Sequence, residues 1–452
     1  MAVESKNLPV EKIMELYEAG DLSAIKELLL TLHPTDIARI FEELEREQVV
    51  SLFRLLPKDK ASDVFLELED PLKEFLVSAI SDKELVEIVD EMETDDATDV
   101  ISELSHEDAK KVLDGIKEKE SIEVRKLLKY PEDTAGGKMQ AELVSVNESA
   151  TVKQAVQSIR EKAKEITNIS NVFVVDDEGK LVGTVSLDKL ILADEDTPIR
   201  EIMNTKPIKV TTDVDQEEVA RMFRRYDLLS MPVVDKEGHL VGRITIDDVV
   251  DVIEEEIFED FYRVASLSVE ERPLDPPLRS IARRSPWLIL NLATAFVAAS
   301  VVKLFEDVIA SLVILAVLMP VVAGEGGNAA MQTVTVIVRG LALGELEIRS
   351  TWRVLYKEAL VGLGNGIIVG SVAGLIAYLL GTNVMVGVLL FLSMAVNLFI
   401  AGLCGAVIPL VLKWLKADPA LSSSIFVTTC TDVAGFFTFL GLGALFIKLG
   451  LL

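Results

Sequence analysis

A single acidic residue lies in the middle of the last long apolar stretch of the chain. Asp432 belongs to the sequence TTCTDVAGFF, inside an apolar segment that extends from about residue 419 to 447. A carboxylate at the centre of a bilayer costs about 2.5 to 3.5 kcal/mol on insertion scales, so a position facing lipid is disfavoured. We therefore expect Asp432 to line water, to bind a cation, or both. The alternative is a packing role, in which Asp432 hydrogen-bonds to neighbouring Ser or Thr groups.

A second stretch with polar groups interrupts the apolar segment between about residues 308 and 338. The sequence LMPVVAGEGGNAAMQTVT (318–335) contains a proline and three glycines, which predict a break in the helix. Irregular backbone at membrane depth is tolerated where it lines a cavity or is buried in protein, so this stretch is expected to face the same interior as Asp432. Glu325 is either a second charge of that interior or an interfacial residue that faces solvent. The residues expected to line the interior are Gly326, Gly327, Asn328 and Gln332, and Thr333 also offers an oxygen.

Five apolar segments carry these groups, and each is long enough to cross about 30 Å of hydrocarbon. They cover roughly residues 286–305, 308–338, 354–380, 383–414 and 419–447. Basic residues flank them at three places: Arg279, Arg283 and Arg284 before the first, Arg349, Arg353 and Lys357 between the second and third, and Lys413 and Lys416 between the fourth and fifth. With five crossings these groups share one side, which the positive-inside rule makes cytoplasmic. The N-terminus is then inside and the C-terminus outside. The glycines of the third segment indicate close helix packing.

Charge divides the chain into two parts. The 452 residues carry a net charge of -28, yet residues 279–452 contain only 8 of the 73 Asp and Glu residues. The large acidic surface expected of the part before Arg279 argues against nucleic acid or anionic lipid as its partner and favours cations or basic partners, unless it is merely solvated. Cys404 and Cys430 are the only cysteines and lie in apolar segments, which fits a reducing, cytoplasmic setting. The start, MAVESKNLPVEK, lacks the apolar core of a secretory signal, so the acidic part is expected to stay in the cytoplasm.

The acidic part begins with a region of helical periodicity, from about residue 8 to 130. Within it, IARIFEEL (37–44), ASDVFLEL (61–68), LVEIVDEM (85–92) and ATDVISEL (97–104) resemble one another, and the first three follow at a constant spacing. This spacing predicts stacked helical hairpins in a small α-helical superhelix.

A second repeat follows beyond Tyr130, where short β-branched runs alternate with helical segments. VVDDEGKLVG (174–183) is echoed further along the chain by VVDKEGHLVG (233–242). Each copy is typical of a strand, a tight turn with glycine, a second strand and a helix. The duplication resembles a tandem CBS domain pair, an α+β fold. Residues 246–265 then predict an amphipathic acidic helix that connects this pair to the apolar part.

The order of these parts, with a GxGGN stretch in the second span and an Asp in the fifth, resembles the MgtE family of magnesium channels over essentially the whole chain. The expected domains are a superhelical N domain (1–132), tandem CBS domains (133–252), a connecting or plug helix with its loop (253–278) and a transmembrane domain of five helices (279–452). The resemblance implies a multi-pass homodimer of the cytoplasmic membrane, in contact with lipid and without nucleic acid as a partner. It also implies a Mg²⁺ pore on the two-fold axis, in which Asp432 binds the hydrated ion.

The resemblance further implies regulatory Mg²⁺ ions bound by cytoplasmic acids. The matching positions are Asp63, Asp95, Asp99, Asp215, Glu217, Asp227, Asp248, Asp251, Glu256, Glu259, Asp260 and Asp418. Taken singly, each is more typical of a plain surface acid. Asp95 with Asp99, and Glu256 with Asp260, are spaced so that two carboxylates share one helical face.

Repulsion between such acids suggests a mechanism of gating. Two charges about 5 Å apart repel by roughly 3 kcal/mol at an effective dielectric constant near 20, and about 5.5 kcal/mol swings a two-state equilibrium from 1:99 to 99:1. Low cytosolic Mg²⁺ is therefore expected to leave the acidic domains apart and the pore able to open. High Mg²⁺ is expected to draw them together, so that the connecting helix closes the pore.

Nucleotide binding by the CBS pair is a separate question. The second copy keeps a Gly-x-x-Ser/Thr-x-x-Asp signature as Gly242, Thr245 and Asp248, but the first has Lys189 in the place of the Asp and Asp188 one position early. A ribose contact needs a carboxylate at a fixed point beyond the strand, which argues against ATP binding by the first copy. ATP stays a candidate ligand of the pair. Asp248 is a candidate both for binding the nucleotide and for binding regulatory Mg²⁺.

Two other classes of function stay open. An ion-coupled carrier would bind its cation at Asp432 during alternating access, and a membrane sensor of Mg²⁺ or nucleotide would transport nothing. Five spans do not divide evenly into the inverted repeats common in carriers, and a sensor needs no acid at mid-span. Enzymatic activity is not expected, because the three histidines, His33, His106 and His239, are scattered and no P-loop or nucleophile motif occurs.

Overall fold

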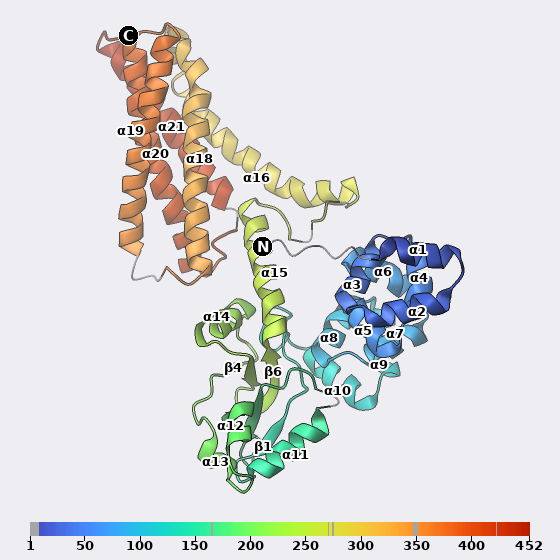
Figure 1. Cartoon of the computed structure of the whole chain (residues 1–452). Helices are drawn as coiled ribbons and strands as arrows, with labels where there is room; N and C mark the ends of the chain where they lie inside the picture. Colours follow the sequence, from blue (N-terminus) through green and yellow to red (C-terminus); the bar gives the residue numbers. More distant parts are fainter. Residues whose placement is uncertain (1–8, 164–165, 270, 274, 347–350, 422) are drawn as a thin grey trace. The chain divides into compact units, whose positions relative to one another are not determined.

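The computed structural model describes residues 9–452, except residues 164–165, 270, 274, 347–350 and 422. Arg349, one of the basic residues expected on the cytoplasmic side, lies outside the described residues. The chain forms two compact units, Met1–Val252 and Ile253–Leu452. Figure 1 traces the elements of each unit.

The described residues of the N domain are helical. They form α1 (Val10–Glu18), α2 (Leu22–Thr31), α3 (Pro34–Glu42), α4 (Arg46–Phe53), α5 (Lys58–Leu66), α6 (Asp70–Ala79), α7 (Asp82–Val89), α8 (Thr94–Glu103), α9 (His106–Gly115) and α10 (Glu118–Leu127). The first three repeats lie in one layer of helices, in which α3 packs against α5, α5 against α7 and α7 against α9. In the other layer α4 packs against α6, and α8 against α10. Phe41 and Phe65, at equivalent places in the first two repeats, are fully buried. The predicted superhelix is confirmed, although the fourth repeat lies in the second layer.

The CBS pair consists of two three-stranded sheets with the same topology. The first half contains β1 (Ser145–Asn147), α11 (Val152–Lys162), β2 (Asn171–Val175), β3 (Leu181–Ser186) and α12 (Leu187–Leu192). The second contains α13 (Ile199–Ile202), β4 (Val210–Thr211), α14 (Gln216–Tyr226), β5 (Ser230–Val234) and β6 (Leu240–Thr245). In each sheet the first strand pairs in parallel with the second, and the second and third strands form an antiparallel hairpin. Gly179 and Gly238 occupy the two hairpin turns with φ of 82° and 93°, which glycine adopts without strain. The two turns also hydrogen-bond to each other, from Leu181 N to Gly238 O (3.0 Å) and from Leu240 N to Gly179 O (3.2 Å).

One continuous helix, α15 (Ile246–Val264), follows the second sheet. The domain boundary expected after residue 252 therefore falls inside a helix. Val249 and Val252 are buried, whereas Ile257 and Phe261 on the predicted apolar face are 62% and 71% exposed. Among the described residues, the apolar face of α15 is therefore buried only in its first part.

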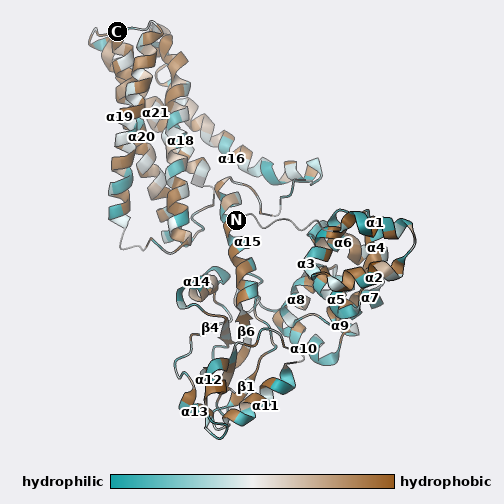
Figure 2. Cartoon of the chain, in the orientation of Figure 1, coloured by the Kyte–Doolittle hydropathy of each residue, from teal (hydrophilic) through white to brown (hydrophobic). Residues whose placement is uncertain are grey.

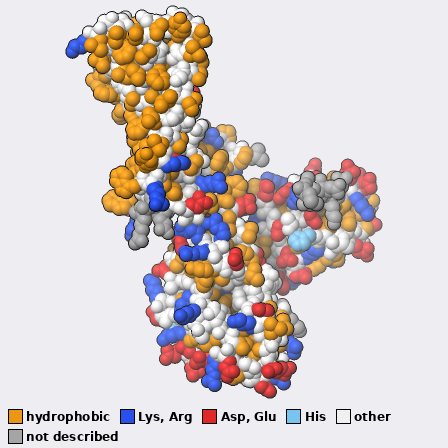
Figure 3. All heavy atoms as spheres, turned by 60° about the vertical axis from the view of Figure 1, so that its left-hand side comes forward, with side chains coloured by type: hydrophobic (Ala, Val, Ile, Leu, Met, Phe, Trp, Pro, Cys, Tyr) orange, Lys and Arg blue, Asp and Glu red, His pale blue; other side chains and the backbone are white. Residues whose placement is uncertain are grey.

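The second unit contains five helices that are long and apolar enough to cross a membrane. They are α16 (Pro277–Lys303), α18 (Ile314–Ala342), α19 (Thr351–Leu379), α20 (Val384–Trp414) and α21 (Ser423–Lys448), and the short α17 (Glu306–Ser311) lies between the first two. α20 is central and packs against α18, α19 and α21. Half of the residues in the most apolar stretch of α20 are buried, whereas only 6% of those in the corresponding stretch of α16 are buried. Figures 2 and 3 show the apolar character of these helices and their hydrophobic outer surface.

Close packing by the glycines of α19 is confirmed for four of them. A Cβ atom at Gly366 would lie 2.7 Å from Ala395 Cα, and one at Gly370 would lie 2.9 Å from Phe391 O, both in α20. Gly362 and Gly374 also approach α20, whereas Gly364 faces open space. Small residues at every fourth position therefore let the two helix backbones come together.

The predicted break in the second span is wrong. α18 is continuous from Ile314 to Ala342, with Pro320 and the three glycines inside it. Pro320 removes only the hydrogen bond that its N–H would donate to the carbonyl of Ala316. Where water is absent, a broken helix would leave several backbone groups unpaired, so the helical ladder outweighs the poor helix propensity of glycine.

Candidate functional site

Asp432 lies on α21 without a partner in the described part of the chain. It is half-buried, and its carboxylate makes no hydrogen bond or ion pair with any described residue. The neighbouring threonines satisfy their hydroxyls within the helix, since Thr428 Oγ1 donates to Ser424 O (2.7 Å) and Thr429 Oγ1 to Ile425 O (2.7 Å). Thr431 Oγ1 likewise donates to Thr428 O at 2.9 Å. The alternative in which these groups bind Asp432 for packing is therefore not what the structure shows.

The polar residues of α18 form an exposed stripe. Gly324, Asn328, Gln332 and Thr335 recur at spacings of three and four residues and are all exposed. Gly327 also faces open space, and Glu325 is half-buried. Gly326 differs, because it is buried and a Cβ atom there would clash with the side-chain amide of Asn397. Of the four residues expected to line the interior, Gly326 instead packs against α20, and Thr333 is buried as well.

Asn397 of α20 was missed by the sequence interpretation. It is fully buried, and its Nδ2 donates to Val322 O of α18 at 2.8 Å. A Cβ atom at Gly435 of α21 would lie 2.9 Å from the same Nδ2. Asn397 therefore sits where the two helices that carry Gly326 and Asp432 both approach α20. The signal was available, since this is a polar residue in the most apolar of the five spans, with a mean hydropathy of 2.5.

Glu358 of α19 is a third acid inside the spans, besides Asp432 and Glu325, and it was not singled out from the sequence. It is 3% exposed, and its Oε1 lies 2.5 Å from Lys357 Nζ. Thr333 Oγ1 of α18 donates to Oε2 at 3.4 Å. With Gln332 and Asn365, these residues line a pocket of about 170 Å³. A buried carboxylate in a span is stable when it is paired in this way, so Glu358 ties α18 to α19.

The two adjacent glycines of α18 allow a matched test of helix packing. Gly326→Ala is expected to lower the stability of the folded protein by about 1 to 3 kcal/mol, because the added methyl group overpacks the contact with Asn397. Gly327→Ala gains the same helix propensity without a clash and should leave the melting temperature unchanged or slightly higher. Thermal unfolding of the detergent-solubilised variants measures the difference. Equal melting temperatures would contradict the packing role of Gly326.

A second site, which we call the acidic joint, gathers carboxylates of the N domain and the CBS pair. Its acids are Glu93, Asp95, Asp96, Asp99, Glu142, Asp247 and Asp248. At its centre Gln140, 1% exposed, donates from Nε2 to Glu93 Oε2 and to Asp95 Oδ2, each at 3.1 Å. Arg243, also buried, donates to Gln140 Oε1 from Nε (2.9 Å) and Nη2 (2.5 Å). The Gln140 amide therefore links one buried cation to two acids.

Hydroxyl groups hold further acids of the joint. Thr94 Oγ1 donates to Glu142 Oε2 (2.6 Å), and Thr167 Oγ1 donates to Glu93 Oε1 (2.7 Å). Thr245 Oγ1 donates to Asp248 Oδ2 at 2.7 Å. Asp95 Oδ1, in contrast, is buried and has no hydrogen-bond partner among the described residues.

Burial and mutual repulsion raise the pKa values of the joint. Burial raises the pKa of Asp95 well above its ordinary value, and the charges of Asp96 and Asp248 add to the shift. Burial and the charges of Asp248 and Glu93 raise the pKa of Asp96 to about 7. Burial raises the pKa of Asp248 to about 6, although its hydrogen bond with Thr245 acts in the opposite direction. Arg243 and, at Asp96, Lys73 act against these shifts, yet the pKa values stay raised, so the ionised form of these acids is unfavourable in the joint.

Several acids expected to bind regulatory ions lie elsewhere in the first unit. Asp63 is exposed on α5, although partial burial of its carboxylate and the charge of Asp59 raise its pKa. Asp215 caps α14 by accepting a hydrogen bond from Glu217 N (2.9 Å), and Asp227 ends that helix in a left-handed conformation. No described contact joins Asp63, Asp215 or Asp227 to the acidic joint. Of the expected positions, the structure gathers Asp95, Asp99 and Asp248 there.

In the second unit, two expected ligands share one arginine. Arg263, near the end of α15, forms ion pairs with Glu259 one turn earlier and with Asp418 between α20 and α21. Asp251 is exposed, and Glu256 and Asp260 are half-buried, on the same helix. The guanidinium supplies at Glu259 and Asp418 the positive charge that a bound ion would supply. The pairing of Arg263 with Asp418 was missed because 155 residues separate the two in the sequence.

Another group of potential metal ligands lies in the turn between β5 and β6. The ligand atoms of Asp235, Glu237 and His239 lie within 4.8 Å of one another. Asp235 already accepts hydrogen bonds from the backbone N–H groups of Glu237 (3.0 Å) and His239 (2.8 Å). Its carboxylate therefore organises the turn, as expected of a tight turn between two strands.

The chain is similar to known proteins along nearly its whole length. The family described as divalent cation transporter (MgtE) matches residues 319–442, the MgtE intracellular N domain matches residues 32–133, and the CBS domain matches residues 136–196 and 199–255. "Magnesium transporter MgtE" of Thermus thermophilus is 36% identical over 441 residues, which are 96% of this chain and 98% of that protein. The protein of the same name from Enterococcus faecalis is 34% identical, over 96% of both chains.

Two solved structures resemble the soluble part. The soluble part of a magnesium transporter is 32% identical, with a TM-score of 0.51, over 55% of this chain and 97% of that chain. The cytosolic domain of the Mg²⁺ channel MgtE in complex with ATP is 38% identical, with a TM-score of 0.52, over 54% of this chain and 99% of that chain.

Proposed function

This chain belongs to the MgtE family of magnesium transporters, and from that premise we propose that it is a Mg²⁺-selective channel of the cytoplasmic membrane. The observation that carries the proposal is the half-buried Asp432 of α21, an acid within a membrane span that binds no described residue. Mg²⁺ loses its water reluctantly, so a path with one carboxylate per chain suits the hydrated ion better than a closed cage of protein ligands. Asn328 and Gln332 on the exposed stripe of α18 are proposed to bind its water shell.

We further propose that the pore forms between two copies of the chain. The exposed polar stripe of α18 and the small buried share of α16 favour a second copy as their cover. Two Asp432 carboxylates facing each other would repel unless a divalent ion lay between them. The basic ends Arg283, Arg353 and Lys413 support a cytoplasmic location of the N domain and an external C-terminus.

The acidic joint is proposed as the sensor that closes the channel. Bound Mg²⁺ would offset the negative charge of Asp95, Asp96 and Asp248, whose pKa values are raised first by burial and then by neighbouring acids. Negative feedback follows, because cytosolic Mg²⁺ then favours the docked state of the N domain and the CBS pair. ATP is proposed as a second ligand of the CBS pair, on the likeness to the ATP complex of a relative's cytosolic domain.

Single-pore currents distinguish the channel from a carrier. Full-length protein in a planar bilayer is expected to pass discrete, Mg²⁺-dependent currents that disappear when Mg²⁺ is raised on the side of the N domain. Transport too slow to resolve as single openings, and dependent on a proton or Na⁺ gradient, would contradict the channel and favour the carrier. No transport under any gradient would favour the sensor.

The joint should also respond to pH in a defined direction. A raised pKa means that the docked joint binds protons that the separated parts release, so docking without Mg²⁺ is favoured at low pH and lost as pH rises through about 6 to 7. Small-angle X-ray scattering of residues 1–266 is therefore expected to show a compact state without Mg²⁺ at pH 5.5, but only with Mg²⁺ at pH 8. Ionic strength must be held constant, because salt screens the same repulsion. A radius of gyration without Mg²⁺ that is equal at both pH values would contradict this prediction.

A further inference from the structure

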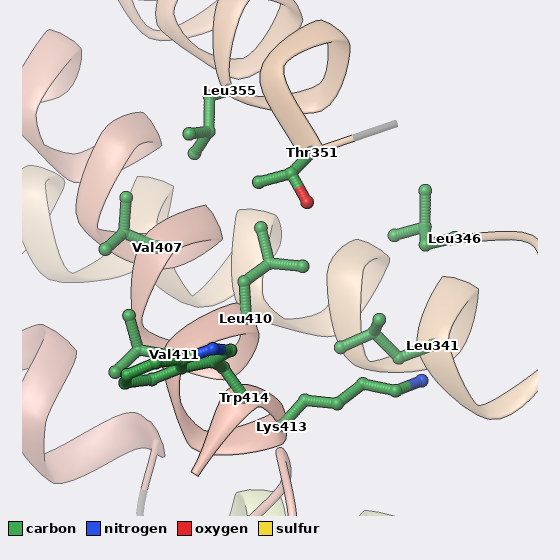
Figure 4. Close-up of a pocket in the computed structure, with 9 residues that line it drawn as sticks. All are labelled: Leu341, Leu346, Thr351, Leu355, Val407, Leu410, Val411, Lys413 and Trp414. Carbon is green, nitrogen blue, oxygen red and sulfur yellow. The ribbon is translucent and has the colours of Figure 1, made fainter. Parts of the chain in front are cut away.

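An apolar pocket of about 250 Å³ lies between the described ends of three membrane helices. Leu341 comes from the end of α18, Leu355 from the start of α19, and Leu410 and Val411 from the end of α20. Figure 4 shows these side chains around the pocket. Leu341 also belongs to a small buried cluster with Ile337 and Ala406, against which Leu355 and Leu410 pack. The pocket therefore belongs to one face of the membrane domain, at the end where α18 and α20 finish.

The rim of this pocket is basic and aromatic. Lys413 lines it and makes no ion pair with any described residue, and in Figure 4 its side chain extends along one edge toward Leu341. Trp414 lines it too and is 74% exposed. Trp352 and Tyr356, in the first turns of α19, are 83% and 68% exposed. Exposed Trp and Tyr beside Lys and Arg are typical of the level of the lipid headgroups, and the basic ends mark the cytoplasmic leaflet.

We propose that this pocket binds a phospholipid of the cytoplasmic leaflet that has an anionic headgroup. One acyl chain occupies the apolar space between Leu341, Leu355 and Val411, and the phosphate lies against Lys413 Nζ. The lining excludes free phosphate as the preferred ligand, because an anion alone leaves the apolar walls uncovered. The acidic surface of the N domain and the CBS pair disfavours anionic lipid there, but Lys413 lies in the part of the chain from Arg279 onward, where bases outnumber acids 11 to 8.

Selectivity of this site comes from the charge and not from the pocket walls. Lipid tails are as apolar as leucine, so any phospholipid fills the pocket equally well. A Lys near the membrane surface favours anionic lipid about fivefold. The pocket determines where the preferred lipid binds, because it holds one acyl chain beside the Lys413 ammonium group.

Native mass spectrometry of the full-length protein tests the proposal. Protein from nanodiscs with equal phosphatidylglycerol and phosphatidylcholine is expected to retain phosphatidylglycerol preferentially. Lys413→Gln should lower that preference about fivefold. Val411→Trp, or Val407→Phe if the first variant does not fold, should remove the retained lipid by filling the pocket. Lys416→Gln is the matched control, because it removes the same charge from an exposed residue that does not line the pocket.

The other outcomes overturn the proposal in distinguishable ways. An equal loss in Lys416→Gln would indicate a diffuse basic belt, and retention unchanged in both pocket-filling variants would place the lipid elsewhere. A loss of dimer mass in Val411→Trp, with lipid retention intact, would identify a second copy of the chain as the occupant. None of these readouts depends on ion transport, so failure of this proposal is separate from failure of the channel.

Discussion

Replacement of Asp432 by alanine is expected to lower Mg²⁺ flux at least about tenfold while the protein stays folded. The carboxylate offers charge-assisted hydrogen bonds to the water shell of the ion, and such bonds contribute about 1.5 to 3 kcal/mol each, or roughly tenfold or more in binding. The fold should survive, because Asp432 makes no hydrogen bond or ion pair with any described residue. Mg²⁺ entry into proteoliposomes that contain a Mg²⁺-sensitive dye measures the loss.

Two matched variants separate charge from size at this position. Asp432→Asn keeps the shape of the side chain and removes its charge, so it should lose flux as the alanine variant does. Asp307→Asn makes the same change in an exposed residue of α17 and should leave flux unchanged. Full selective uptake by a monodisperse Asp432→Ala variant would show that the carboxylate does not act on the ion path. The same assay on Glu325→Gln decides between the two roles left open for that residue.

The architecture of this chain could be predicted because each of its parts has a periodic signal. The helical repeat of the N domain placed Phe41 and Phe65 at equivalent buried positions, and the repeated VVD-EG-LVG sequence placed Gly179 and Gly238 in equivalent turns. The lengths of the apolar segments gave five spans. All these signals are local, and each records one helical face or one hairpin.

The prediction for α18 failed because a local rule was applied without its surroundings. Glycine and proline weaken a helix in water, where freed backbone groups find other partners. In an apolar environment the helical hydrogen bonds are harder to replace, and the space left by Gly326 is filled by Asn397 of α20. Asn397 lies 75 residues from the Val322 carbonyl to which it donates, so no local pattern reveals that these two helices pair here.

The candidate sites show the same division between local and distant signals. Asp432 was predicted because an acid in an apolar segment is conspicuous on its own. Gln140 and Arg243 were not, although they form the centre of the acidic joint, because 103 residues separate them and neither is unusual where it stands. Asp95 and Asp99 of α8 were named through the family resemblance, and Asp96 beside Asp95 was overlooked. The resemblance therefore named three of the seven acids of the joint, Asp95, Asp99 and Asp248, but not the neutral and basic residues that hold them.

The double variant Asp95→Asn, Asp248→Asn is expected to close the channel without Mg²⁺. Asparagine keeps the oxygen that accepts from Gln140 at position 95 and from Thr245 at position 248, so the hydrogen bonds of both residues can persist. It removes two charges from a site in which each close pair repels by roughly 3 kcal/mol. Two such pairs approach the roughly 5.5 kcal/mol that swings a two-state equilibrium from 1:99 to 99:1. Flux at low Mg²⁺ on the side of the N domain should therefore fall to the level that the wild type shows at high Mg²⁺.

The direction of this change decides how the joint works. If Mg²⁺ acts by relieving repulsion, neutral side chains replace it, and scattering from residues 1–266 of the double variant shows the compact state at pH 8 without the ion. If Asp95 and Asp248 act instead as direct ligands whose bonds to Mg²⁺ are essential, the variant stays extended and the channel stays open at every Mg²⁺ concentration. Glu107→Gln on α9 removes one charge from a side chain that is 84% exposed, so it should reproduce neither result. The raised pKa values of Asp95 and Asp248, caused first by burial and then by neighbouring acids, favour loss of charge as the switch, because the docked joint already prefers these groups uncharged.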